Sequence, residues 1–135
     1  MKPDVSLELI VEGRSVFTSR GKWLHPLFEL EGWLQRNPTD VSHAEIHDKI
    51  VGRGSAFLIA RLGIRTVHAG LLSRLGKDVF DRRGITCSWD LLLDEIECRT
   101  EGLLRDVTDV DTAYRILSER AEMARRREGV IPSAG

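Results

Sequence analysis

The stretch from Ala44 to Leu62, AEIHDKIVGRGSAFLIARL, constrains the fold more than any other part of this sequence. It predicts the end of a short buried strand (Val41 to His47), an abrupt turn at Asp48, and a helix from about Lys49 to Leu62. Asp48 is a favourable N-cap, because its carboxylate can accept hydrogen bonds from the free N–H groups of a first helical turn. A strand that leads directly into a helix is the repeating unit of an α/β fold.

Hydrophobic periodicity predicts further strands and helices on both sides of this unit. Apolar residues alternate with polar ones between Val5 and Val11, which indicates a half-buried strand. A turn at Glu12-Gly13-Arg14 and a second strand from Ser15 to Ser19 would complete a β-hairpin. The remaining predicted elements are a helix from Pro26 to Asn37, a strand over Ile64–Ala69, a helix from Ser73 to Gly84, a strand over Ile85–Trp89, a helical turn from Asp90 through Ile96, and a final helix from a capping box at Thr108 and Asp111 to about Arg127.

This order of elements predicts a single α/β domain with a mixed sheet of about five strands. Strands that alternate with helices imply right-handed crossovers and a parallel portion of sheet, with helices on both faces in a three-layer α/β/α arrangement. We expect the domain to span residues 1–104. An additional C-terminal helix would occupy residues 105–128, and residues 129–135 would form a flexible tail.

Composition excludes several classes of protein. The chain has 135 residues and a net charge of −1, so no overall field attracts nucleic acid or an anionic membrane. No apolar run approaches the roughly 18 residues of a membrane span, and the first residues do not resemble a signal peptide. The two cysteines, Cys87 and Cys98, suggest neither a disulfide framework nor a metal site. We therefore expect a cytoplasmic protein with reduced thiols, without a cofactor, and with neither nucleic acid nor membrane as a partner.

The predicted helix start after the strand is the main candidate for a ligand site. Free N–H groups at a helix N-terminus favour negative charge, and Gly52 and Gly54 let a ligand approach the backbone. Lys49 would bind a phosphate or carboxylate, and Asp48 a hydroxyl or an exocyclic amine. The simpler alternative is that Asp48 is only an N-cap and Lys49 a solvated lysine. The full set of predicted ligand-binding residues is Lys22, His25, Asp48, Lys49, Gly52, Ser73 and Arg99.

Several of these residues also carry a resemblance. Pro26-Leu27 opens the first predicted helix, D-K-I-V-G from Asp48 opens the second, Ser73 opens the third, and Gly84-Ile85 and Arg99 flank the last strand. With the order of elements, they resemble a family of small uncharacterised proteins that have a cytidine-deaminase-like fold, over roughly Ser6 to Leu104. This chain lacks the family's usual Cys-Pro-Met-Glu run after the arginine, and Cys98 stands where Asn is common.

The resemblance implies a deaminase scaffold, but the zinc ligands are missing. Zinc deaminases hold the metal with a His or Cys at one helix start and two cysteines at the next. The corresponding starts here are His25-Pro26-Leu27 and Asp48-Lys49, and no cysteine is present at either. His43-Ala44-Glu45 spells the deaminase H-A-E, but in a predicted strand. His43, Glu45 and His47 share one face of that strand; they are more often a solvated face than metal ligands. We predict no metal site.

Three functions remain open. The first is a binding module for a nucleotide-like or other small anionic ligand. The second is a metal-independent enzyme in which Lys49 or Asp48 transfers protons, or Lys49 forms a Schiff base. The third is an interaction protein that docks, or forms a homodimer, through the C-terminal helix. We expect packing or capping roles for the other candidates. Trp23, Trp33 and Trp89 would be core or packing groups rather than base-stacking platforms, Ser73 a helix cap, and Arg99 part of a salt bridge with Glu101 or of the pocket rim.

Overall fold

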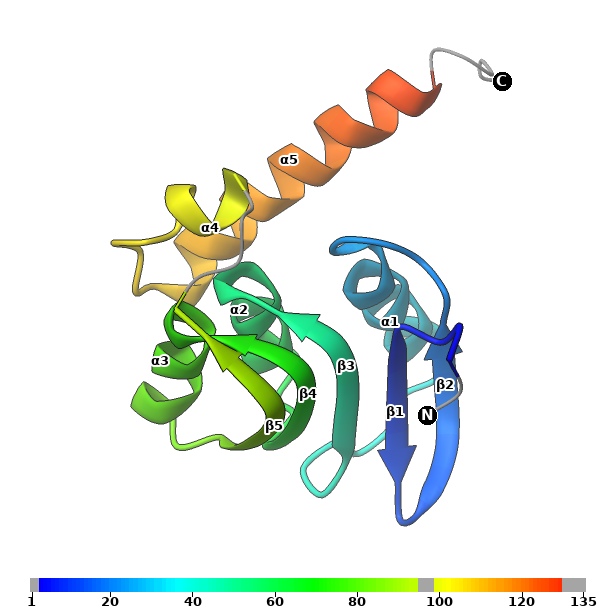
Figure 1. Cartoon of the computed structure of the whole chain (residues 1–135). Helices are drawn as coiled ribbons and strands as arrows, with labels where there is room; N and C mark the ends of the chain where they lie inside the picture. The colour runs from blue at the N-terminus through cyan, green and yellow to red at the C-terminus, as the bar shows by residue number, and fades with distance from the viewer. Residues whose placement is uncertain (1–2, 95–98, 130–135) are drawn as a thin grey trace.

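The chain forms an α/β fold around a mixed sheet of five strands. The computed structural model describes residues 3–94 and 99–129. Its strands are β1 (Leu7–Val11), β2 (Arg14–Ser19), β3 (Glu45–Val51), β4 (Thr66–Ser73) and β5 (Thr86–Leu93), and its helices are α1 (His25–Arg36), α2 (Arg53–Arg61), α3 (Arg74–Arg82), α4 (Arg99–Leu103) and α5 (Val110–Gly129) (Figure 1). The strand order is β2-β1-β3-β4-β5. β1 is antiparallel to β2 and to β3, whereas β3, β4 and β5 are parallel. The predicted α/β class and the mixed sheet of about five strands are confirmed.

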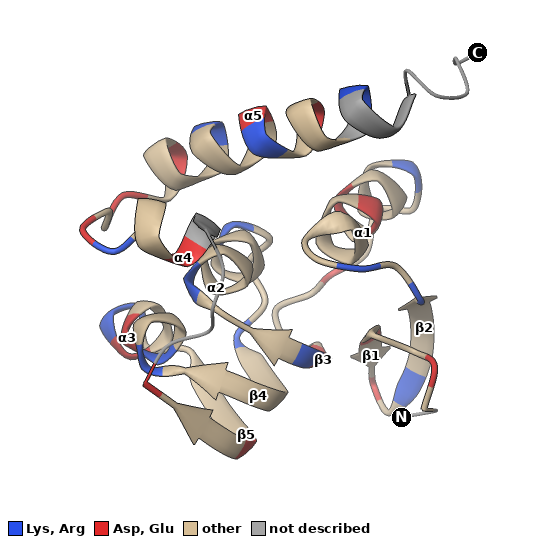
Figure 2. Ribbon diagram, turned by 45° about the horizontal axis from the view of Figure 1, so that its top comes forward, with Lys and Arg blue, Asp and Glu red and all other residues tan. Residues whose placement is uncertain are grey.

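The main helices lie on one face of the sheet. Figure 2 shows α1, α2 and α3 in a row over the strands, with α5 crossing above them. On β3 and β4, Ile46 and Val67 point towards these helices and are buried, whereas His47 and His68 point the other way and are partly exposed. In the described part of the chain, no helix covers that second face. The prediction of helices on both faces is therefore not met, and the third layer is α5, which packs on the helices.

One hydrophobic core joins the sheet to the helices above it. Phe57 and Ile59 of α2 are almost completely buried, together with Leu7 and Leu9 of β1. Leu117 of α5 belongs to the same cluster, as do Leu104 and Ala113. Since burial of apolar surface is the main driving force of folding, the C-terminal helix contributes to the stability of the domain rather than projecting from it over its whole length.

The strand β3 continues past the predicted turn. Asp48 lies inside β3, and the helix α2 begins only at Arg53, with Gly52 as its N-cap. The N-cap assignment of Asp48 is therefore wrong. Ile50 and Val51 pair with Leu71 and Leu72 of β4, so strand pairing overrides the local preference of Asp48 for a helix start. β4 is longer than predicted for the same reason and runs to Ser73.

The alternation of buried and exposed residues in β4 is interrupted near its end. In β4, Val67 and Ala69 are buried and the next buried residue is Leu72, so the alternation of period two is broken at Gly70 and Leu71. Glycine is required there, because a Cβ on Gly70 would lie 2.6 Å from the backbone oxygen of Lys49. Where the two backbones approach this closely, the side chains of the strands change the face on which they lie, just before α2 and α3 begin.

The predicted N-cap of α3 is confirmed, whereas that of α5 is wrong. Ser73 caps α3 as predicted, since its Oγ accepts a hydrogen bond from the N–H of Gly76 at 2.9 Å. The cap of α5 is Asp109 rather than Thr108, because Asp109 Oδ2 accepts from the N–H of Thr112 at 2.8 Å. Asp90 does not open a helical turn; it lies in β5, which pairs with β4 as far as Leu93. The predicted end of that turn, Ile96, and the predicted tail from 130 onward lie outside the described residues.

Candidate functional site

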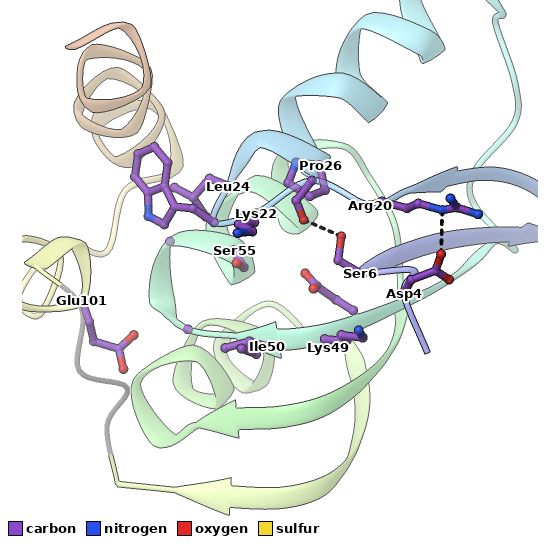
Figure 3. Close-up of a pocket in the computed structure, with 15 residues that line it drawn as sticks. Asp4, Ser6, Arg20, Lys22, Leu24, Pro26, Lys49, Ile50, Ser55 and Glu101 are labelled. Carbon is purple, nitrogen blue, oxygen red and sulfur yellow. Dashed lines mark hydrogen bonds and ion pairs between the residues drawn. The ribbon is translucent and has the colours of Figure 1, made fainter. Parts of the chain in front are cut away.

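A cavity of about 550 Å³ opens between the end of β3, the first turn of α2 and the loop that precedes α1 (Figure 3). The first residues before β1 close one side of it, and Glu101 of α4 lies at another. Its lining residues are Asp4, Ser6, Arg20, Gly21, Lys22, Trp23, Leu24, Pro26, Asp48, Lys49, Ile50, Gly52, Gly54, Ser55 and Glu101. The cavity therefore lies at the starts of α1 and α2, where the sequence predicted a ligand site.

Asp48 supplies a carboxyl group with a raised pKa to this cavity. It is two residues after the buried Ile46 in β3, so its side chain points to the helix-covered side of the sheet. Burial raises the pKa of Asp48 to about 7, although the backbone N–H groups of Ile50 and Lys49 act to lower it. Near neutral pH this carboxyl group is present in both protonation states, which is rare for an aspartate.

The loop before α1 is held in place and carries a strained tryptophan. Ser6 Oγ donates to the backbone oxygen of Gly21 at 2.8 Å, and the N–H of Gly21 donates to Ser19 Oγ at 3.1 Å. Trp23 has a φ of +58°, a left-handed conformation that is a genuine outlier for a bulky residue. Trp23 is 40% exposed and lines the cavity, so of the predicted core or packing roles the core role is wrong.

The basic side chains that line the cavity differ in whether they already have a partner. Arg20 pairs with Asp4, with 3.2 Å between Nε and Oδ2, and Lys49 Nζ donates to the backbone oxygen of Pro3. Lys49 is exposed, as is the neighbouring Ile50. Lys22 has no side-chain partner among residues 3–94 and 99–129. A ligand would therefore meet the ammonium group of Lys22, unpaired among the described residues, and it could replace the backbone oxygen of Pro3 as the partner of Lys49.

The N-terminus of α2 is already partly occupied by a carboxylate from the chain itself. Glu101 is 3% exposed, and its Oε2 accepts a hydrogen bond from the N–H of Arg53 at 2.6 Å. The predicted salt bridge between Glu101 and Arg99 involves a side chain outside the described residues. With Glu101 in this place, the first N–H of α2 is not free for a phosphate, contrary to the prediction of a bare helix start.

Arg53 was not predicted from the sequence and connects the start of α2 to α3 and to the segment between α4 and α5. Its guanidinium is buried and donates to the backbone oxygens of Leu75, Leu104 and Val107 at 2.6–2.8 Å. It also pairs with Asp78 at 3.1 Å. Burial acts to raise the pKa of Asp78, but the hydrogen bonds from Arg82 and Arg53 hold it below its ordinary value. Nothing in the local sequence Gly52-Arg53-Gly54 indicates that the arginine makes these buried contacts.

Four of the seven predicted ligand residues meet at the cavity. Lys22, Asp48, Lys49 and Gly52 line it together. His25 does not; it borders a separate hollow of about 290 Å³ between α1 and α5. Ser73 is fully buried and caps α3, and neither residue lines the main cavity. Asp48 and Lys49 lie in β3 rather than at a helix start, Gly52 precedes α2 as its N-cap, and His25 is the first residue of α1.

The H-A-E sequence and the histidines lie elsewhere. Glu45 opens β3 and contacts His47, with 2.5 Å between Oε2 and Nε2, on the sheet face opposite the helices. His47 in turn lies beside His68, with 5.6 Å between ring centroids. Among the described residues no group of three or more His, Cys, Asp or Glu side chains has the arrangement of a metal site.

The remaining candidates are packing groups where they are described. Trp33 contacts Phe17 at 5.7 Å between ring centroids, and Trp89 lies half-buried beneath the ammonium of Lys77. Cys87 is a free thiol whose pKa is raised by burial. Cys98 lies outside the described residues. Between residues 3 and 94 and between 99 and 129, no helix has the length and apolar character needed to cross a membrane.

Comparison with known protein families assigns the chain to one of them. Residues 1–121 match the family model described as "TM1506: Domain of unknown function (DUF1893)". The chain belongs to the DUF1893 family. A solved structure of a DUF1893 family protein (TM1506) from Thermotoga maritima is similar over 87% of this chain and 81% of that chain, with 25% sequence identity and a TM-score of 0.74. A comparison with curated proteins found no match. DUF1893 membership agrees with the small α/β fold seen here.

Proposed function

We propose that this DUF1893 protein binds a small anionic, nucleotide-like ligand in the cavity beside Asp48. A volume of about 550 Å³ lies within the range of small-molecule sites, which are largely apolar with a few polar groups. Trp23, Leu24 and Ile50 supply apolar surface, whereas Asp48 and Ser55 supply polar atoms. The convergence of these residues on one cavity is the observation that carries the proposal.

The basic side chains account for the anionic part of the ligand. Lys22 and Lys49 line the cavity, and neither is committed to an ion pair within the described residues. Because Glu101 occupies the first N–H of α2, the phosphate or carboxylate would be held by these ammonium groups rather than by the helix N-terminus. The anion would then lie beside Lys22 and Lys49 rather than at Gly52.

We further propose that the scaffold is deaminase-like. Zinc deaminases keep their metal between two helix starts, and the cavity here is lined by Pro26 of α1 and by Gly52 and Gly54 at the start of α2. The shared position supports common ancestry of the pocket. The absence of cysteine at either helix start supports a function other than zinc-dependent deamination.

A thermal-shift screen with nucleotides and sugar phosphates tests ligand binding. We expect at least one of these compounds to raise Tm, and Lys49→Ala together with Lys22→Ala to abolish the shift. Arg36→Ala removes the same charge from an exposed position of α1 and serves as the matched control, since it should leave the shift unchanged. If no phosphate-bearing compound stabilises the unmodified protein, the proposal is wrong.

Proton transfer is a second candidate, favoured by the acidity of Asp48. A catalytic acid or base works best when its pKa is near the operating pH, and that of Asp48 is about 7. Lys49 is exposed and therefore less suited to this role. If the ligand found above is turned over, Asp48→Asn should abolish turnover while ligand binding is retained; turnover that survives this change would exclude Asp48 as the acid or base.

The third function, docking through the C-terminal helix, has less support. Ala113 and Leu117 of α5 are fully buried in the core of the domain. The apolar stripe predicted for that helix is therefore used at least in part within the chain itself.

A further inference from the structure

We infer that the cavity selects a planar heterocycle that presents two adjacent N–H donors on one edge, as guanine does, with Asp48 accepting both donors and the Trp23 indole covering the face of the ring. This inference rests on the proposed ligand site and adds the chemical class of the ligand. It uses three observations: the position of Asp48, the strained backbone of Trp23, and the charges that surround them.

Asp48 is partly buried in β3, and its carboxylate has few partners. Within the described residues, no cationic side chain forms an ion pair with it, and its neighbours Lys49 and Ile50 offer only their backbone N–H groups. An ionised carboxylate is an acceptor with two oxygens, so it can bind two parallel N–H donors in a bidentate manner. A ligand edge with a ring N–H beside an amino group would replace the hydrogen bonds that burial has removed.

Trp23 lines the same cavity as Asp48 and has a strained backbone. Its left-handed backbone is unfavourable for a side chain of this size, and such strain persists only when the surroundings impose it. The residues on either side, Lys22 and Leu24, also line the cavity. An aromatic side chain that covers the face of a base contributes stacking energy that is independent of the edge of the base. Trp23 therefore accounts for the preference for a planar ring, and Asp48 for the choice among rings.

The protonation of Asp48 decides which edge is accepted. The ionised form accepts two N–H donors, whereas the protonated form fits an edge with one donor and one acceptor, as in adenine. Because burial places the pKa near 7, binding of a donor–donor edge should weaken below that pH. The other charged groups at the cavity are Asp4 and Arg20, which pair with each other, Glu101, which is bonded to the N–H of Arg53, and Lys22 and Lys49.

Calorimetric titration with guanosine, inosine and adenosine monophosphates at pH 8 and pH 6 tests the inference on the unmodified protein. The inosine compound lacks only the amino group of guanine and carries the same phosphate. At pH 8 we expect the guanosine compound to bind at least about tenfold more tightly than the other two, as for loss of a hydrogen bond to a charged group. Its advantage over the inosine compound should fall by up to about tenfold at pH 6.

Two variants separate the roles of the two side chains. An amide at position 48 offers one acceptor and one donor, so Asp48→Asn should bind the guanosine and inosine compounds with similar affinity. Trp23→Ala should weaken all three nucleotides by a similar factor of about tenfold and leave ribose 5-phosphate unaffected. Circular dichroism and Tm of both variants confirm that they are folded before the titrations are compared.

The outcomes distinguish this inference from the proposed function. Equal affinity for the three nucleotides, or tighter binding of adenosine monophosphate at pH 8, overturns the inference and leaves the anion site intact. Binding of ribose 5-phosphate as tight as that of guanosine monophosphate does the same. Failure of every one of these compounds to bind removes the proposed function as well.

Discussion

Glu101 and Arg53 are joined by a hydrogen bond that connects two helices far apart in the sequence. Glu101 Oε2 in α4 accepts from the backbone N–H of Arg53, the first residue of α2, at 2.6 Å. The carboxylate is almost completely buried. A side chain from the C-terminal part of the chain thus does for α2 what an N-cap side chain usually does, because Gly52 has no side chain to accept the bond.

Loss of this carboxylate should destabilise the protein. Glu101→Ala leaves the N–H of Arg53 buried without an acceptor, and we expect the free energy of unfolding to fall by about 1–3 kcal/mol in urea denaturation. Glu119→Ala, at an exposed position of α5, is the matched control and should change it by less than about 0.5 kcal/mol. Equal stability of the two variants would show that the bond contributes nothing.

The raised pKa of the partly buried Asp48 makes stability depend on pH. Its pKa is about 7 in the folded protein and 3.8 without burial, so between about pH 4 and pH 7 the folded state binds more protons than the unfolded state. Stability should therefore fall as pH rises through this window, by up to about 4 kcal/mol, and level off above pH 7. Denaturation at pH 4 to 8 should show a smaller decline for Asp48→Asn; parallel declines would contradict the shifted pKa.

The left-handed backbone at Trp23 predicts an inverted order of stability for two substitutions. At an ordinary position alanine is more stable than glycine, whereas at a φ of +58° glycine avoids a cost of about 1 kcal/mol or more that every other residue bears. Trp23→Gly should therefore have a higher Tm than Trp23→Ala. The same pair of substitutions at Arg36, in α1, should give the usual order, with alanine more stable. A usual order at both sites would mean that residue 23 relaxes.

Gly70 should not tolerate even a methyl group. A Cβ there would lie 2.6 Å from the backbone oxygen of Lys49, which cannot move without disturbing the pairing of β3 with β4. We expect Gly70→Ala to lower the free energy of unfolding by about 1–3 kcal/mol. Gly102→Ala in α4 is the control: nothing lies within 4 Å of its Cβ position, so stability should rise slightly. Unchanged stability of Gly70→Ala would show that the two strands separate easily.

The order of elements was predictable because it follows from hydrophobic periodicity and turn residues. Alternation in Leu7–Val11, the Glu12-Gly13 turn and the Ser73 cap each act locally, and the structure confirms them. The end of β3 was not predictable in this way. Asp48 favours a helix start, but pairing of Ile50 and Val51 with a strand about 20 residues later decides the conformation.

The position of the cavity was predicted better than the contacts of the residues around it. Lys22, Asp48, Lys49 and Gly52 meet at one cavity because the ends of β3 and the loop before α1 are adjacent in this topology. The role of Glu101 at the start of α2 depends on a contact across 48 residues, which no local pattern reveals. Trp23 was given a core or packing role because hydrophobicity alone does not report the left-handed backbone of a residue that lines the cavity.

The burial of Leu117 has a consequence for any experiment that shortens the chain. Its Cδ2 would lie 3.2 Å from a Cβ on Gly54, so the first half of α5 is packed directly behind the turn that borders the cavity. Removal of everything after Arg105 would uncover the back of α2 and expose apolar surface to water. A fragment of that kind would self-associate through newly bared core residues, and its molar mass would say nothing about assembly of the intact protein.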